Sequence, residues 1–144
     1  MERLLALLDS ISTMTLATTD PEGNPYTAPV YFVRGDEMRL FFFSEAKSSH
    51  SQHIDKNPKV AVAIYPECES WRDIKGLQLR GEVRLVESTM EWDSAWARYQ
   101  VKFPFVSALK AVVAQNQLYV FIPNWIRLVD NSRGFGFKKE WNFT

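Results

Sequence analysis

Several residue types that mark particular protein classes are scarce in this sequence. It has one cysteine, Cys68, so neither an intramolecular disulfide nor a cysteine-based zinc cluster can form. Its 17 basic and 17 acidic residues cancel, which disfavours binding driven by nucleic-acid phosphates. No segment approaches the ~20 uncharged apolar residues of a membrane helix, and the N-terminus lacks the features of a signal peptide. We therefore expect a cytoplasmic protein with no membrane and no nucleic-acid partner.

Aromatic side chains, by contrast, are abundant in a chain of single-domain length. They make up 14% of the 144 residues, and hydrophobic residues make up 46%, which is enough for a buried core. No linker or internal repeat divides the chain, so we predict one domain over residues 1–144. Either the core is rich in aromatic rings, or some of them line a ligand site or a subunit interface.

Short strands separated by turns dominate the chain. Alternating apolar residues and turn signals predict strands within residues 14–19, 26–33, 37–43, 60–65, 77–86, 118–122, 125–129 and 135–141. Turns at Asp20–Pro25 and Arg34–Asp36 join the first three in an antiparallel meander. Gly81 interrupts the alternation of its strand, which indicates a bulge or a bend there.

Short helices are inserted between these strands. Residues 2–11 and 48–57 have helical character, and a capping box at Ser88–Glu91 begins a third helix. The third helix carries an aromatic-rich stripe that either packs as core and interface or walls a ligand pocket: Trp92, Ala95, Trp96, Tyr99 and Phe103. Another helix is expected from Pro104. Because the strands come in runs, we predict a mainly β fold, an antiparallel barrel with short helical insertions.

A cluster of polar residues stands where the strand ending in Ser44 gives way to the next helix. Lys47, Ser48, Ser49 and His50 gather at the start of that helix. A helix N-terminus presents unpaired N–H groups and the positive end of a dipole, and hydroxyls with a cation complete a phosphate site. Ser48 or Ser49 could equally serve only as a helix cap beside an exposed lysine.

Two neighbouring strands end in apolar residues that could form a flat shelf. One contains Ala28–Phe32 and the other contains Leu40–Ser44. A planar ring could lie on this shelf, hydrogen-bonded by the strand backbone. The alternative is that both segments are ordinary barrel core.

These segments, in this order, resemble the FMN-binding split β-barrel proteins related to pyridoxamine 5′-phosphate oxidase. The resemblance spans nearly the whole chain and is carried by Met14–Thr19, Pro25–Phe32, Leu40–Ser44, Lys47–His50, Asn57–Val62 and Leu77–Val83. The C-terminal segments Ile122–Ile126 and Gly134–Trp141 look like a small uncharacterised subgroup of these proteins.

The resemblance implies an antiparallel split barrel of six to seven strands, working as a homodimer with FMN at the interface. The FMN phosphate would meet Lys47, Ser48, Ser49 and His50. The ring would lie against the backbone of Pro29, Val30, Tyr31, Phe42, Phe43 and Ser44. The partner subunit would add groups from positions Gln78, Arg80 and Trp141.

Two departures affect what the resemblance implies for the cofactor. Ser49 stands where such proteins often have arginine, and His50 where they often have lysine, which removes up to two fixed charges from the phosphate site. FMN affinity is therefore expected to be lower, or another anion binds. The oxidase's C-terminal substrate-binding segment is not found, so pyridoxal phosphate synthesis is not predicted.

The implied activity is that of an FMN-dependent oxidoreductase acting on a small molecule or on NAD(P)H. The flavin would supply the redox chemistry, so no catalytic side chain and no metal ion are required. Three alternatives stay open. They are a non-catalytic flavin-binding protein for storage or sensing, a haem-binding variant of the split barrel, and a flavin-free scaffold.

Two other motifs do not support a function. Arg133–Phe137 matches the start of an RNA-recognition octapeptide, but Lys138 and Glu140 break the pattern, so RNA binding is not predicted. His50 and His53 share one helix face, yet no cysteine or third histidine lies near them, and Asp55 points elsewhere by its spacing, so a metal site is not predicted.

Overall fold

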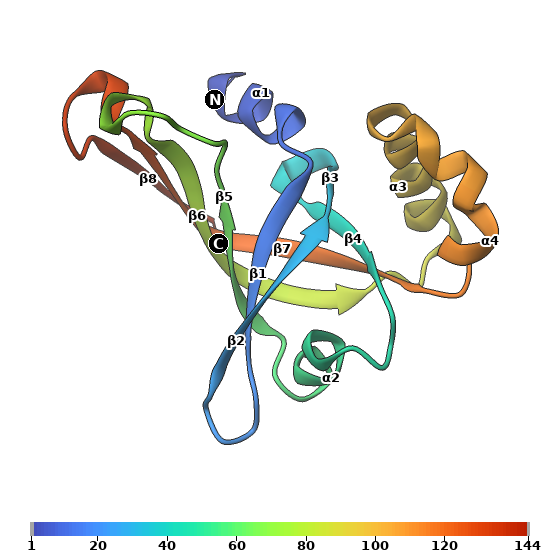
Figure 1. The fold of residues 1–144 in the computed structure, drawn as a ribbon. Coiled ribbons are helices and arrows are strands. Elements are labelled where there is room, and N and C mark those ends of the chain that lie inside the picture. Colours follow the sequence, from blue (N-terminus) through green and yellow to red (C-terminus); the bar gives the residue numbers. More distant parts are fainter. Residues whose placement is uncertain (1, 144) are drawn as a thin grey trace.

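The fold is a curved antiparallel sheet with helices at its ends and on its outer side (Figure 1). A computed structural model describes residues 2–143. The strands are β1 (Thr13–Thr19), β2 (Pro25–Tyr31), β3 (Val33–Arg34), β4 (Leu40–Ser44), β5 (Lys59–Ile64), β6 (Lys75–Leu85), β7 (Gln117–Asp130) and β8 (Lys138–Asn142). The helices are α1 (Glu2–Ser10), α2 (Ser49–Lys56), α3 (Thr89–Lys102) and α4 (Lys110–Val113). Four 3-10 turns complete the chain: η1 (Asp36–Met38), η2 (Trp71–Asp73), η3 (Pro104–Leu109) and η4 (Asn131–Arg133).

The eight strands form one sheet in the order β2-β1-β5-β6-β7-β4-β3, and β8 pairs with β7. All the pairings are antiparallel. The sheet curls into a half-barrel, so that β2 at one end of the order comes close to β4 near the other end. This arrangement confirms the predicted mainly antiparallel split barrel with short helical insertions, although residues 2–143 form eight strands where six to seven were expected.

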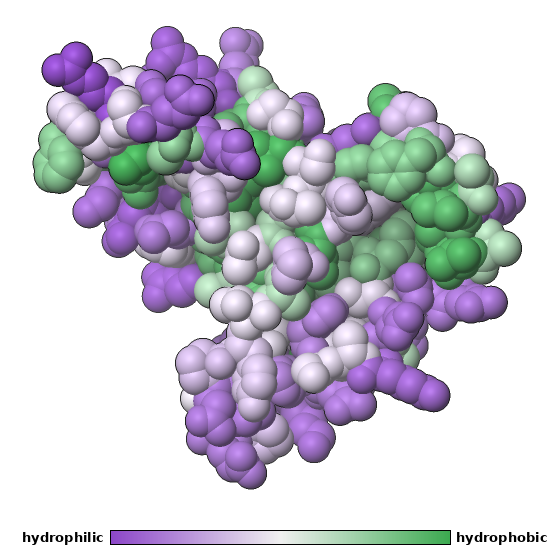
Figure 2. Space-filling model, in the orientation of Figure 1, coloured by the Kyte–Doolittle hydropathy of each residue, from purple (hydrophilic) through white to green (hydrophobic). Residues whose placement is uncertain are grey.

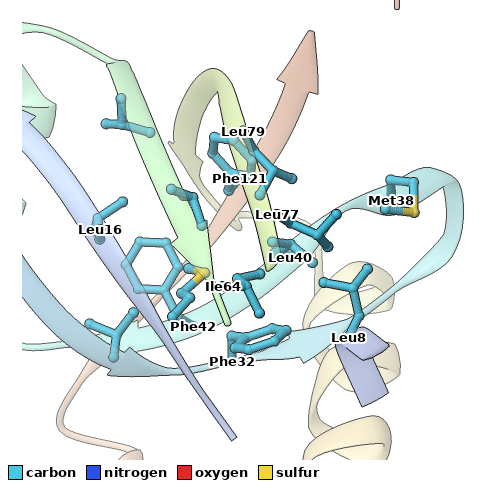
Figure 3. Packing of buried hydrophobic residues seen from close by; sticks show 14 of the residues in the cluster. Leu8, Leu16, Phe32, Met38, Leu40, Phe42, Ile64, Leu77, Leu79 and Phe121 are labelled. Atoms are coloured by element: carbon cyan, nitrogen blue, oxygen red, sulfur yellow. The ribbon is translucent and has the colours of Figure 1, made fainter. Parts of the chain in front are cut away.

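The inside of the half-barrel is filled by apolar side chains that alternate along the strands. In β6, Leu77 and Leu79 are buried whereas Gln78 and Arg80 are exposed. The buried side chains meet those of β1, β4, β5 and β7 in one cluster, of which Figure 3 labels Leu8, Leu16, Phe32, Met38, Leu40, Phe42, Ile64, Leu77, Leu79 and Phe121. The period-two pattern that predicted the strands is therefore the pattern that builds this core.

A second apolar cluster lies on the outer side of β4 and β7, under the segment that contains α3, η3 and α4. Phe41 and Val120 point outward from the sheet and pack against buried Ala95 and Tyr99 of α3. Trp92 and Trp96, which are partly buried, pack against the same cluster. The predicted stripe thus fixes α3 to the barrel wall. Between residues 2 and 143, no helix combines the length and the apolar character needed to span a membrane.

The end of the chain differs from the prediction at Pro123. Residues 118–122 and 125–129 were expected to be separate strands, but both belong to the continuous strand β7. Its register against β6 shifts between Arg80 and Gly81, so Asn124 is an extra residue with no partner in β6. The shift confirms the bulge indicated by Gly81, and it lets a strand continue past a proline that lacks an N–H group.

Candidate functional site

Helix α2 begins at the end of β4 and presents its N-terminus beside exposed polar side chains. Ser48 is its N-cap, and its Oγ accepts a hydrogen bond from the Ser51 backbone N–H at 3.3 Å. The side chains of Lys47 and Ser49 are exposed next to this cap. The cap that the sequence left as an alternative is therefore present, and it leaves a lysine and a serine available beside the positive end of the helix. Figure 2 shows a mostly hydrophilic surface over α2 and the β1–β2 hairpin.

His50 ties α2 to β4 and carries no fixed charge for a ligand. Its Nε2 lies 2.7 Å from Oγ of the buried Ser44 and 3.3 Å from Oγ of Ser48. Burial lowers the pKa of His50 below the ordinary value for histidine, and the neighbouring His53 lowers it further. The imidazole is therefore neutral at neutral pH, so Lys47 supplies the positive charge among the four predicted phosphate ligands.

His53 holds the other side of α2 against the β1–β2 hairpin. Its Nδ1 lies 2.9 Å from Oγ1 of Thr18, and its ring lies 4.7 Å from the ring of Tyr26. Sequence reasoning missed Thr18 as a partner, although its position continues the buried alternation of Met14 and Leu16. A polar residue at an inward position of a strand was the available signal, because a buried hydroxyl requires a hydrogen-bond partner.

β2 and β4 lie near each other without pairing, and we call the gap between these two strands the seam. β2 pairs only with β1, and β3 pairs with β4 only at Leu40 and Phe41. Within residues 2–143, no backbone hydrogen bond joins β2 to β4. Each strand therefore has an edge along which a ligand could bond to N–H and C=O groups.

The predicted ring-contacting residues lie along this seam, and their side chains point in different directions. Val30 and Phe42 point into the barrel core, and the ring of Phe42 stacks on that of Tyr119 at 5.4 Å. Pro29 and Tyr31 are exposed on β2. Phe43 points outward, and Ser44 turns inward to His50. Because several of these side chains are committed elsewhere, the backbone is what this segment can offer to a planar ring.

The three residues predicted to act from a partner subunit do not share one surface. Gln78 and Arg80 lie on the outer face of β6, and the Arg80 guanidinium lies 4.3 Å from the Trp125 ring centre. Arg127 donates to Oε1 of Gln78 at 3.4 Å. Trp141 pairs with the buried Ile126 and packs on the inner core, so it lies on the opposite face of the sheet.

The outer face that carries Arg80 is hollowed where β1, β5 and β6 adjoin. A shallow cavity of about 450 Å³ is lined by small and polar residues, among them Thr19, Pro25, Lys59, Arg80 and Glu82. Nowhere between residues 2 and 143 do three His, Cys, Asp or Glu side chains cluster in a way that could hold a metal ion.

This fold, with α2 between the end of β4 and the β1–β2 hairpin, defines a protein of the pyridoxamine-phosphate-oxidase-like split-barrel class. The family model described as pyridoxamine 5′-phosphate oxidase matches residues 1–130, so the chain belongs to this family. The resemblance found in the sequence is thereby confirmed.

Relatives with similar sequences belong to a small uncharacterised subgroup. A UPF0306 protein of Photorhabdus laumondii is 34% identical over 111 residues, which cover 77% of this chain and 73% of the relative.

Proteins outside this subgroup have solved structures with a similar fold. ChuZ of Campylobacter jejuni matches with a TM-score of 0.82 and 17% identity, over 98% of this chain and 58% of ChuZ. HutZ, a haem storage protein of Vibrio cholerae, matches with a TM-score of 0.73 and 19% identity, over 85% of this chain and 88% of HutZ. At these identities the likeness concerns the fold alone.

Proposed function

We propose that the protein binds FMN and acts as a flavin-dependent oxidoreductase. The observation that carries this proposal is the position of the α2 N-terminus, with exposed Lys47 and Ser49, beside the open edges of β2 and β4. A cationic helix start suits a phosphate, and free strand backbone suits the hydrogen-bonding edge of a planar ring. Bound FMN would supply the electron or hydride transfer that these side chains cannot perform.

The residues of this chain would hold the cofactor rather than react with it. The Lys47 ammonium, the Ser49 hydroxyl and the first N–H groups of α2 would bind the phosphate. The backbone of Pro29–Tyr31 and Phe42–Ser44 would orient the ring. Since His50 is neutral and already bonded to Ser44, the phosphate would meet one side-chain cation, and we expect a modest affinity that decreases with added salt.

The proposed assembly is a homodimer that places FMN between the subunits. Members of this family are often dimers. The outer face of β6 carries exposed Gln78 and Arg80 above a shallow cavity, so a second subunit could bring these two side chains to the flavin. Trp141 faces the core of its own subunit, and we leave it out of the proposed site.

Steady-state turnover separates an oxidoreductase from a storage protein. The protein reconstituted with FMN should oxidise NADH or NADPH with oxygen or a dye as acceptor, at a rate proportional to the bound FMN. Free FMN at the same concentration serves as the control. Tight FMN binding without turnover of either nucleotide would contradict the oxidoreductase and favour a storage or sensing role.

Haem binding is the second candidate, because HutZ shares the fold and is described as a haem storage protein. The two histidines of this chain do not decide against it, because each ring has one nitrogen in a hydrogen bond and one that iron could bind. The exposed Lys47 and Ser49 at the start of α2 suit the phosphate of FMN, a group that haem lacks, and FMN is therefore the better supported cofactor.

A further inference from the structure

The two strands that border the open seam are joined by a side chain from the helical insertion. The Tyr99 hydroxyl, on α3, lies 2.9 Å from the carbonyl oxygen of Tyr31 at the end of β2. The same hydroxyl lies 3.1 Å from the carbonyl oxygen of Phe41 in β4. The side chain is 3% exposed. One buried phenol thus contacts the backbone on both sides of the seam.

The surroundings of Tyr99 hold this hydroxyl in place. Its ring meets the Phe43 ring edge-on at 5.0 Å and lies 5.7 Å from the Phe103 ring. The Tyr31 ring in turn packs edge-on against Phe103 at 5.3 Å and lies 6.3 Å from the Phe105 ring. Aromatic contacts therefore attach the end of β2 to the same insertion that supplies the hydroxyl.

The chemistry of the hydroxyl suits a permanent contact. Burial raises the pKa of Tyr99, so the phenol keeps its proton at neutral pH and can donate. No backbone ladder joins β2 to β4 within residues 2–143, so this contact bridges strands that the sheet itself does not connect. The nearest backbone link is the pairing of Val33 with Phe41 between β3 and β4, so without the hydroxyl the spacing of β2 and β4 beyond that pair would depend on apolar packing.

We infer that Tyr99 is a positioning residue that fixes the spacing of β2 and β4 and thereby shapes the seam for the flavin ring. The inference rests on the proposed function for its ligand. It assigns to α3 the role of holding the binding backbone of both strands in register, in addition to covering the outer side of the barrel. Tyr99 itself does not touch the reacting atoms.

The test is the Tyr99→Phe variant, which removes the hydroxyl and retains the ring. In the protein without flavin, hydrogen exchange of the β2 amides should be about tenfold faster, as expected for the loss of one hydrogen bond. Exchange in β5 and β6 should not change. The dissociation constant for FMN should increase about tenfold. At saturating FMN, the visible circular dichroism and the midpoint potential of the bound flavin should also differ from the wild type, because the ring is held differently.

Asn131→Ala is the control for a general loss of stability. Asn131 is 8% exposed, and its side chain donates to the Trp71 carbonyl oxygen at 2.8 Å and accepts from the Gly136 N–H at 3.0 Å, away from β2 and β4. This variant should lose thermal stability comparably and keep the wild-type exchange in β2 and the wild-type flavin spectrum. If Tyr99→Phe keeps wild-type exchange in β2, or binds FMN with wild-type affinity and spectrum, the inference is wrong. A wild-type protein that binds no FMN instead refutes the proposed function, and with it the flavin part of the inference.

Discussion

Replacing Lys47 with alanine is expected to weaken FMN binding by roughly tenfold to a hundredfold and to leave riboflavin binding nearly unchanged. Lys47 is exposed beside the N-terminus of α2, where it is the proposed cation for the phosphate. A hydrogen bond to a charged group contributes about 1.5–3 kcal/mol to binding. Riboflavin has no phosphate, so it makes no such bond with Lys47 and its binding should not change. Fluorescence titration of both ligands, at low and at moderate salt, measures the difference.

Lys56→Ala is the control for this experiment. Lys56 is an exposed lysine at the opposite end of the same helix, so its removal changes the net charge equally without affecting the proposed site. FMN should bind to this variant almost as it binds to the wild type. Equal losses in the two lysine variants, or a parallel loss of riboflavin binding by Lys47→Ala, would show that the phosphate lies elsewhere.

Gly81→Ala is expected to reduce the free energy of unfolding by about 3 kcal/mol. A Cβ atom at this position would lie 2.1 Å from the backbone oxygen of Ile122 and 2.8 Å from Cα of Pro123. Both atoms belong to the backbone of β7, which cannot move aside without opening the β6–β7 pairing. For a chain of this length the melting temperature should fall by roughly 10 °C, as calorimetry or thermal circular dichroism would record.

Gly23→Ala provides the contrast, because it tests backbone conformation without crowding. Gly23 has a φ of 85°, and no atom lies within 4 Å of a Cβ built there. Its replacement should reduce the free energy of unfolding by about 1 kcal/mol, because alanine is less stable than glycine at a positive φ. If the two alanine variants melt at the same temperature, close contact at the bulge does not determine the stability of this strand pair.

Local patterns in the sequence were enough to predict the elements with the clearest periodicity. The alternation of β6, the cap residue Ser88 and the break at Gly81 all appear in the structure as expected. The capping box is only half formed, however. Ser88 accepts from the Glu91 backbone N–H at 3.3 Å, whereas the Glu91 carboxylate pairs with Arg84 at 2.9 Å. A tertiary ion pair has replaced the local contact.

Other features depend on conformations or distances that local patterns do not encode. The strand expected from residue 37 begins only at Leu40, because Glu37 and Met38 adopt positive φ values of 57° and 63° in a 3-10 turn. Non-glycine residues rarely adopt this conformation, so the sequence contained no signal for it. Pro123 was expected to end a strand, yet the bulge opposite Gly81 accommodates it.

One part of the candidate site could be predicted from local sequence patterns, and another part depends on tertiary contacts. The sequence located Lys47–His50 at a helix start, since polar residues after an apolar strand are a local signal. It could not predict that His50 is bound to Ser44 and neutral, which depends on burial. The contacts of His53 with Thr18 and of Tyr99 with Tyr31 join residues 35 and 68 positions apart. Only the folded chain brings such pairs together.

The visible absorption spectrum of the purified protein, recorded after incubation with FMN and passage through a desalting column, tests FMN binding most directly. Our account predicts flavin bands that stay with the protein at close to one FMN per chain. It also predicts that the wild-type protein retains no haem when haem is offered in place of FMN. A protein that retains no flavin after this reconstitution would contradict the account, and a Soret band from retained haem would replace FMN with haem as the cofactor.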